Sequence, residues 1–172
     1  IRDVRLGDVV VSTKIYGYES GKATPQEFEL RPEVANSSYS LEQRARADAR
    51  NGNWVNRLKQ LVEFSFPKVH IGPIAAGEKN VAGKETEVVQ FIKTNYGDAL
   101  AVEMEGRGFL EAARANSNTN AIVIRGISNL LNDKNETKES QNQAAANAAA
   151  FLFEMLSNLK PVSKTPILSK IE

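Results

Sequence analysis

The stretch between Ala99 and Asn129 constrains the fold more than any other part of this sequence. Its composition predicts a strand (99–104), a helix (about 107–115) and a second strand (121–125), which together make a compact strand–helix–strand unit. Such a unit has a right-handed crossover and two parallel strands, so both strands end at the same edge of the sheet. Open α/β folds bind their ligands at that edge. We therefore expect Glu105 and Asn129 to line one crevice.

Two carboxylates lie at the end of the first strand of this unit. The two-residue period of a strand places Glu103 and Glu105 on one face, and Val102 and Met104 on the other. The two carboxylates would then be about 7 Å apart. One interpretation is a polar face of the sheet. The other is that the free backbone N–H groups and the dipole of the following helix hold the Glu105 carboxylate ionised.

The residue inventory limits the chemistry that these side chains can join. The 172 residues include no cysteine, which excludes thiol nucleophiles, thiolate metal sites and disulfides. The single histidine, His70, would have to serve any Ser–His–Asp triad and any imidazole metal site. Nothing near His70 in the sequence offers an orienting partner, so we interpret it as a core or edge residue of a strand. Carboxylates and amides remain as the expected catalytic groups, and no metal is expected.

The pattern of apolar residues predicts the remaining elements. It favours strands over 9–15 and 69–77, a helix near 85–94, and helical structure from 40 to about 64 that is interrupted at 51–53. A strong helix is expected over 141–156, with six residues available to the core: Ala145, Ala148, Leu152, Met155, Leu156 and Leu159. Arg44, Arg46 and Arg50 form a basic stripe, which is either a solvated helix face or a phosphate-binding surface.

Charge and hydropathy indicate neither a nucleic-acid nor a membrane partner. Lys and Arg number 22 and Asp and Glu number 21, so the net charge of +1 gives no general attraction to polyanions. The sequence has no run of about 18 apolar residues and no basic, hydrophobic leader. The expectation is a soluble cytoplasmic protein. The chain starts at Ile1 rather than at a methionine, which suggests a processed or incomplete N-terminus.

Two segments of the chain resemble one known family. Residues 101–106 (AVEMEG) and 123–129 (VIRGISN) are similar to motifs of the purine nucleoside phosphorylase and nucleosidase superfamily, and closest to its methylthioadenosine/S-adenosylhomocysteine nucleosidase-like branch. Residues 71–78 resemble the family's Gly-containing segment beside the nucleobase. The resemblance implies a three-layer α/β/α sandwich around a mixed, largely parallel sheet, and members that assemble as homo-oligomers. It assigns residues 1–160 to this domain and 161–172 to a tail or linker.

The resemblance also implies which residues hold the sugar. Glu105 matches the carboxylate that accepts hydrogen bonds from the ribose hydroxyls, and Met104 matches the residue packed under the sugar. Glu103 lies beside them and is expected in the same substrate site. Glycosidic cleavage passes through an oxocarbenium-like sugar, so a fixed negative charge on these hydroxyls stabilises the transition state.

The residues expected at the base depart from the family pattern. Ser128 and Asn129 match a Ser–Asp pair whose acid hydrogen-bonds or protonates the departing purine, but this chain has an amide there. An amide is no general acid, although it offers both a donor and an acceptor, which suits a 6-oxopurine. Asn80 stands where related nucleosidases often place an aromatic residue that stacks on the base, and Val81 would contact the base instead.

The implied activity is cleavage of the N-glycosidic bond of a purine nucleoside or nucleotide, by phosphorolysis or by hydrolysis. No cofactor is implied, apart from inorganic phosphate as the co-substrate of a phosphorylase. The resemblance implies that the family's first strands, which supply the groups that select phosphate or water, have no counterpart in this sequence. Lys134, Lys138 and Arg125 are candidate cations nearby, each also explained as a surface or structural charge. The alternative is a catalytically silent nucleoside-binding or oligomerisation module, which Asn129, Asn80 and the apparent lack of the family's N-terminal strands would favour.

Overall fold

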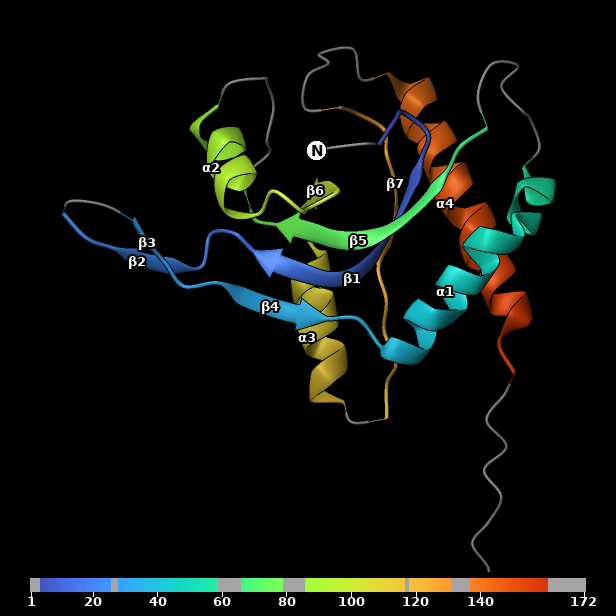
Figure 1. Ribbon diagram of the computed structural model, residues 1–172, viewed down its shortest axis with the longest axis horizontal. Coiled ribbons are helices and arrows are strands. Elements are labelled where there is room, and N and C mark those ends of the chain that lie inside the picture. Colours follow the sequence, from blue (N-terminus) through green and yellow to red (C-terminus); the bar gives the residue numbers. More distant parts are fainter. Residues whose placement is uncertain are drawn as a thin grey trace, which may run out of the picture.

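The computed structural model describes residues 4–25, 28–58, 66–78, 86–116, 118–130 and 137–160. In chain order the elements are β1 (Val9–Gly17), β2 (Gly21–Ala23), β3 (Phe28–Leu30), β4 (Glu33–Asn36), α1 (Tyr39–Asn51), the 3-10 helix η1 (Asn53–Arg57), β5 (Val69–Ala76), α2 (Glu87–Asn95), β6 (Ala101–Glu103), α3 (Gly106–Ala115), β7 (Ile124–Gly126) and α4 (Lys138–Asn158) (Figure 1). The predicted strands and helices that fall within these ranges are present with shifted ends, except that the helical segment expected after residue 53 is seen only as the short η1, and its continuation from 59 to 64 lies outside the described residues. The predicted tail, 161–172, lies outside the described residues.

A mixed sheet of five strands forms the centre of the described structure. Its order is β4–β1–β5–β6, and β7 also pairs with β1. The strands β1, β5 and β6 are parallel, whereas β4 and β7 are antiparallel to β1. The first half of β1 pairs with β7 and its second half with β4, on the side away from β5. The short strands β2 and β3 form a separate antiparallel pair that projects from the body (Figure 1).

The direction of β7 shows that the predicted parallel strand–helix–strand unit is wrong. β6 and β7 are not neighbours, because β5 and β1 lie between them, and β7 runs opposite to β1 and therefore to β6. In Figure 1, α3 runs across the strands rather than back along them, so it does not return the chain to a parallel neighbour. The C-terminal ends of β6 and β7 consequently leave the sheet at opposite edges.

Helices cover both faces of the sheet, which confirms the three-layer architecture. Val10 of β1 belongs to an apolar cluster with Leu110 of α3, whereas its neighbours Val9 and Val11 pack with Trp54 of η1 and residues of α1 and α4. The last turn of α2 packs with Ala75 of β5 on the same face as α4. The alternating side chains of β1 and β5 thus belong to two cores, and among the helices of the described residues α3 is the one that covers the second face.

The predicted interruption of the helix after Asn51 is confirmed. Gly52 adopts φ 69°, a left-handed conformation that side-chain-bearing residues rarely take, and its N–H bonds to the carbonyl of Asp48. The chain then turns into η1, which places Trp54 edge-on against Phe151 of α4, with ring centroids 5.9 Å apart. The glycine therefore lets α1 and η1 contact the same layer.

The core-facing side of α4 differs from the predicted one. Of the six residues expected in the core, Met155 is buried, whereas Leu152, Leu156 and Leu159 are exposed. The buried side instead carries Ala144, Asn147, Ala150 and Phe151. The Asn147 side-chain amide donates to the carbonyl oxygen of Gly7 at 2.6 Å, so a polar contact helps to fix the buried side of this helix. Of the helices in the described part of the chain, none combines the length and apolarity that crossing a bilayer requires.

Candidate functional site

The junction between β6 and α3 holds the two carboxylates that the sequence singled out. The Glu103 side chain turns back toward the helix, and its Oε2 accepts the backbone N–H of Glu105 at 2.9 Å and of Gly106 at 2.7 Å. These are among the first N–H groups of α3, which have no partner within the helix. Glu103 is only 4% exposed, so the helix N-terminus and its dipole surround a buried anion.

This arrangement corrects the predicted role of Glu105 at the helix N-terminus. Glu105 is the N-cap residue, yet its side chain makes no capping hydrogen bond. The strand ends at Glu103, so the two-residue period that placed both carboxylates on one face does not extend to Glu105. Glu103 binds the free N–H groups instead. The Glu105 side chain is left exposed next to Met104, which is 48% exposed.

Close packing explains the glycine that follows. A Cβ added to Gly106 would lie 2.6 Å from Cδ1 of Ile15 and 2.9 Å from Oε1 of Glu103. Both distances are shorter than ordinary van der Waals contact. The first turn of α3 therefore approaches β1 and the Glu103 carboxylate closely only because residue 106 has no side chain.

Backbone hydrogen bonds tie together the ends of the three parallel strands. The N–H of Tyr18, after β1, bonds to the carbonyl of Ala76, and the N–H of Gly77 bonds to the carbonyl of Glu103. The Glu19 carboxylate accepts the N–H of Glu78 at 2.6 Å. The Glu105 carboxylate thus lies at a rigid edge of the sheet, where α/β proteins bind ligands.

Arg125 of β7, which belongs to the motif 123–129, lies close to this junction. Its Nη1 lies 3.9 Å from Oε2 of Glu103. Val123 and Ile127, which alternate with Arg125 along the chain, pack in the cluster that faces α3, so Arg125 points to the same side of the sheet as Glu103. The sequence indicated Arg125 only as a nearby cation, because a contact between strands that are separated by two others leaves no local pattern.

The residues expected at the base lie partly within the described structure. Ser128 is half-buried and Asn129 is exposed. Leu130, next to Asn129, packs on the apolar cluster that contains Leu110 of α3. The segment after β7 therefore borders the same core as the β6–α3 junction, although it does not reach it by the predicted strand edge. Asn80 and Val81 lie outside the described residues.

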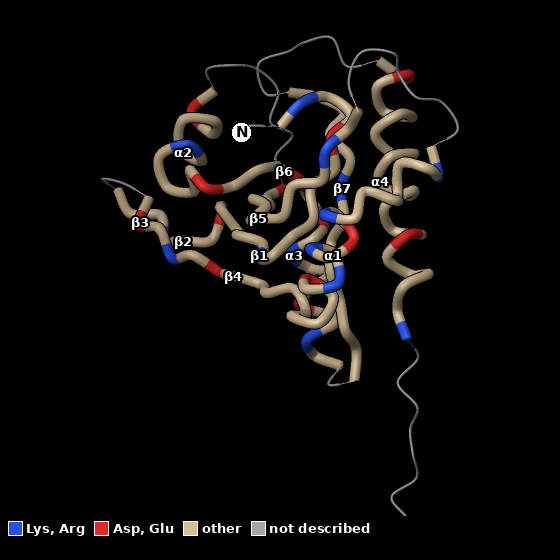
Figure 2. The backbone as a smooth tube through the Cα atoms, turned by 45° about the vertical axis from the view of Figure 1, so that its right-hand side comes forward, with Lys and Arg blue, Asp and Glu red and all other residues tan. Residues whose placement is uncertain are grey.

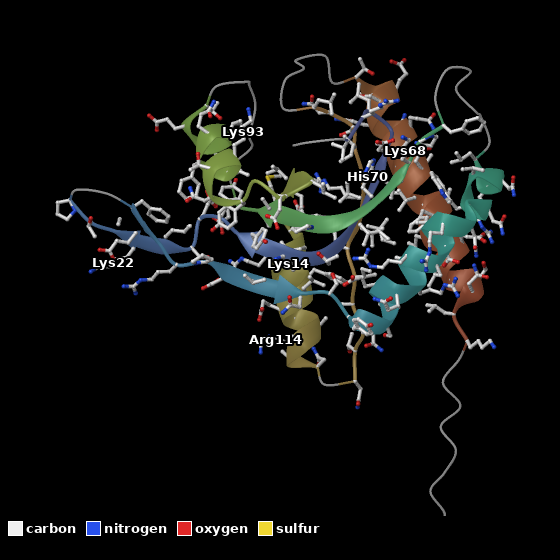
Figure 3. All side chains as sticks on the ribbon, in the orientation of Figure 1. Lys14, Lys22, Lys68, His70, Lys93 and Arg114 are labelled. Atoms are coloured by element: carbon white, nitrogen blue, oxygen red, sulfur yellow. The ribbon has the colours of Figure 1, made fainter. Side chains whose placement is uncertain are left out.

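The single histidine has a partner that the sequence analysis missed. His70 Nε2 lies 2.8 Å from Oδ2 of Asp8, which is buried, and the Asp8 carboxylate also accepts the N–H groups of Arg5 and Lys68. The parallel register of β1 and β5, with Val10 opposite His70, brings them together. Figure 3 shows His70 and Lys68 at the start of β5, at the end away from β6. The pair fastens the chain before β1 to β5.

The other candidate cations are mostly engaged in ion pairs or lie elsewhere. Arg44 bonds both oxygens of the buried Asp48, and Arg46 bonds Glu42, so both arginines are engaged in ion pairs within α1, where charged residues alternate with others along the helix (Figure 2). Lys138 begins α4, and Lys134 lies outside the described residues. Within the described ranges no group of three or more His, Asp or Glu side chains is placed to hold a metal ion.

An aromatic cluster on the α2 side contains the groups with shifted pKa values. Burial, and then the neighbouring Tyr16, raise the pKa of the Tyr96 phenol, whose oxygen is buried and has no hydrogen-bond partner among the described residues. Burial, and then Glu19, likewise raise the pKa of Tyr18. A hydrogen bond to Tyr16 is the main reason that the pKa of Lys14 is raised. These shifts concern packing around α2 rather than the β6–α3 junction.

Comparison with known proteins gives consistent matches along almost the whole chain. The profile of the phosphorylase superfamily matches residues 2–157. A 5′-methylthioadenosine/S-adenosylhomocysteine nucleosidase from Desulfotalea psychrophila is 23% identical over 174 residues, covering 93% of this chain and 64% of the relative. A death domain-containing ATP nucleosidase from Amphimedon queenslandica is 29% identical over 160 residues, covering 87% of this chain and 30% of the relative.

A solved structure shares the fold. The 5′-methylthioadenosine/S-adenosylhomocysteine nucleosidase from Neisseria meningitidis, in complex with methylthio-immucillin-A, superposes with a TM-score of 0.70 at 24% identity. The match covers 92% of this chain and 64% of that one. The chain thus spans less than two thirds of the length of these nucleosidases.

Proposed function

This chain belongs to the phosphorylase superfamily, and from that premise we propose that it cleaves the N-glycosidic bond of a purine nucleoside or nucleotide. The observation that carries the proposal is the β6–α3 junction. There the exposed carboxylate of Glu105 lies next to the half-exposed side chain of Met104, and the buried Glu103 carboxylate accepts hydrogen bonds from the backbone N–H groups of Glu105 and Gly106. Both Glu105 and Met104 belong to the motif 101–106, which by its resemblance to the family is expected to bind the sugar.

The proposed chemistry at Glu105 is electrostatic. Positive charge develops on the sugar as the bond to the base breaks, and a carboxylate hydrogen-bonded to the ribose hydroxyls stabilises that charge. Met104 would pack against the sugar and keep water from the carboxylate. Loss of one such preorganised interaction costs roughly 10²- to 10³-fold in rate.

For the base we propose contact with Ser128 and Asn129, and with Asn80 and Val81. The amide of Asn129 can donate to a carbonyl and accept from a ring N–H, which supports a 6-oxopurine. The two curated relatives described above are named for adenine-containing substrates, and they support the wider class of purine nucleosides and nucleotides. Because those relatives are nucleosidases, we propose water as the attacking group, with phosphate as the alternative.

A silent nucleoside-binding module is the second candidate, and Asn129 favours it. An amide has no proton to give to the departing purine, so the step that an acid would assist is left to solvent or to another group. Such a protein would hold the sugar on Glu105 and release no base. We also propose that the protein is cytoplasmic and that it forms a homo-oligomer; the exposed Phe109 side chain on α3 supports the second proposal.

The test is chromatographic detection of free base after incubation with inosine, guanosine, adenosine, 5′-methylthioadenosine or ATP, each with and without phosphate. Glu105→Ala should lower base release by about 10²-fold or more. Glu111→Ala is the matched control, because Glu111 is another α3 carboxylate, paired with Arg114 at the surface, and its loss should leave release unchanged.

Each outcome separates the candidates. Phosphate dependence identifies a phosphorylase and independence identifies a nucleosidase, and a preference for inosine or guanosine supports the assignment of Asn129. No release, together with nucleoside binding that Glu105→Ala abolishes, supports the silent module. Equal release by Glu105→Ala and Glu111→Ala contradicts the role of Glu105.

A further inference from the structure

We infer that Glu103 is a positioning residue, which sets the backbone at Glu105 and links it to Arg125 without touching the substrate. The inference rests on the proposed function, because it concerns how the sugar-binding carboxylate is held. It also replaces the expectation that Glu103 contacts the substrate with a different role for the same residue.

The hydrogen bonds of the Glu103 carboxylate are made to the backbone around Glu105. One oxygen of Glu103 accepts the N–H groups of two consecutive residues, Glu105 and Gly106, at 2.9 and 2.7 Å. Bonds to a carboxylate are charge-assisted and roughly twice as strong as neutral ones. They fix the peptide planes on both sides of Glu105, and with them the direction in which its side chain leaves the backbone.

The Glu103 carboxylate is also buried. The other oxygen of Glu103, Oε1, is also inaccessible to solvent and has no hydrogen-bond partner among the described residues. It lies 2.9 Å from where a Cβ on Gly106 would stand, beside Cδ1 of Ile15. A ribose hydroxyl cannot reach an oxygen enclosed in this way, whereas the exposed Glu105 carboxylate needs no rearrangement to bind one.

Glu103 also faces the second motif, residues 123–129. The oxygen that caps α3 also faces the Arg125 guanidinium at 3.9 Å, and Arg125 lies four residues before Asn129. Arg125 is the only cation facing Glu103 that the described residues place within ion-pair distance. The same buried anion thereby joins the segment proposed for the sugar to the segment proposed for the base.

A double-mutant cycle on base release tests this role in the full-length protein. Glu103→Gln should lower kcat/KM by about tenfold or more, because misplacing a catalytic group by about 1 Å can cost 10²-fold. The loss should fall on kcat rather than KM. In the Glu105→Ala background the same substitution should change kcat/KM by less than about twofold, since the group that it positions is gone. Equal losses in both backgrounds would overturn the inference, because they would show that Glu103 acts on the substrate directly.

Backbone amide hydrogen exchange provides a test that needs no activity. In Glu103→Gln the Glu105 and Gly106 amides should exchange several-fold faster than in the wild type, roughly as expected when a charge-assisted bond becomes neutral. Glu103→Ala, which removes the acceptor altogether, should accelerate them further, with Glu111→Ala as the control. Unchanged exchange at both amides overturns the inference. A wild type that releases no base would instead refute the proposed function, and exchange would still decide the role of Glu103.

Discussion

Replacing Gly106 with alanine tests the packing of the β6–α3 junction. The added Cβ would stand 2.6 Å from Cδ1 of Ile15 and 2.9 Å from Oε1 of Glu103. Carbon atoms prefer separations of about 3.5–4.0 Å, so the fully buried Ile15 or the helix must move by about 1 Å. Overpacking of this kind costs about 1–3 kcal/mol, partly offset by up to ~1 kcal/mol of helix propensity. We expect Gly106→Ala to be less stable by about 1–2 kcal/mol.

Gly108→Ala is the matched control, because a Cβ at Gly108 in the same helix would meet no atom within 4 Å. That variant should gain roughly 0.5–1 kcal/mol from helix propensity. Urea denaturation of both variants measures the difference, and purine release measures the consequence for Glu105. Gly106→Ala should also lower kcat, because the added methyl pushes on the Glu103 carboxylate. Equal stability and equal activity of the two variants would refute the proposed packing at this junction.

Three further substitutions test contacts elsewhere in the molecule. Tyr96→Phe removes a buried hydroxyl without a described partner and should stabilise the fold by about 1 kcal/mol. Burial raises the pKa of Tyr96 above its usual 10.0, so the folded state keeps the phenol proton to higher pH than the unfolded state, and the stability of the wild type falls as pH rises through the folded pKa. Tyr96→Phe should therefore lose less stability than the wild type in alkaline denaturation. An equal loss of stability in both proteins would contradict this prediction. Asp8→Asn leaves one side-chain oxygen for the three groups that now bond to the carboxylate, His70 among them. The free energy of unfolding, measured by urea denaturation, should fall by about 2 kcal/mol. An unchanged urea midpoint would contradict these contacts. In Gly126→Ala the added Cβ would lie 2.0 Å from the backbone carbonyl oxygen of Ala144. This variant should be destabilised more than Gly106→Ala, because a helix backbone moves aside less easily than a side chain. Melting temperatures of both variants, measured by circular dichroism, test the order.

Local patterns predicted most of the elements because local forces determine them. Val9–Ile15 is rich in β-branched residues and forms the central strand, and Gly52 ends α1 because its φ is positive. The face of α4 was predicted less well. Its apolar residues surround the helix, so periodicity could not choose between Leu152 and Phe151, and the contact of Asn147 with Gly7 lies far apart in the sequence.

The two errors at the site have one physical origin, which is the end of β6. Strand periodicity applies only while the backbone stays extended, and here it stops at Glu103. The carboxylate that can fold back to the first N–H groups of α3 is therefore Glu103, and Glu105 becomes the exposed N-cap. Because α3 then runs across the strands, the handedness rule for parallel units no longer places β7.

The antiparallel β7 changes how Glu105 and Asn129 can share a ligand. With parallel strands, both would stand side by side over one strand edge. In this fold the two residues follow strands that end at opposite ends of the sheet. They border the same face, the one that α3 covers, because Leu130, beside Asn129, packs on the same cluster as Leu110. The Arg125–Glu103 ion pair crosses that face between them. If both residues contact one nucleoside, this ion pair joins the segment that would hold its sugar to the segment that would hold its base. Arg125→Gln should for this reason weaken binding of an intact nucleoside more than binding of free ribose or free base, and calorimetric titration with all three would show it. Equal weakening of all three would mean that each site is held independently.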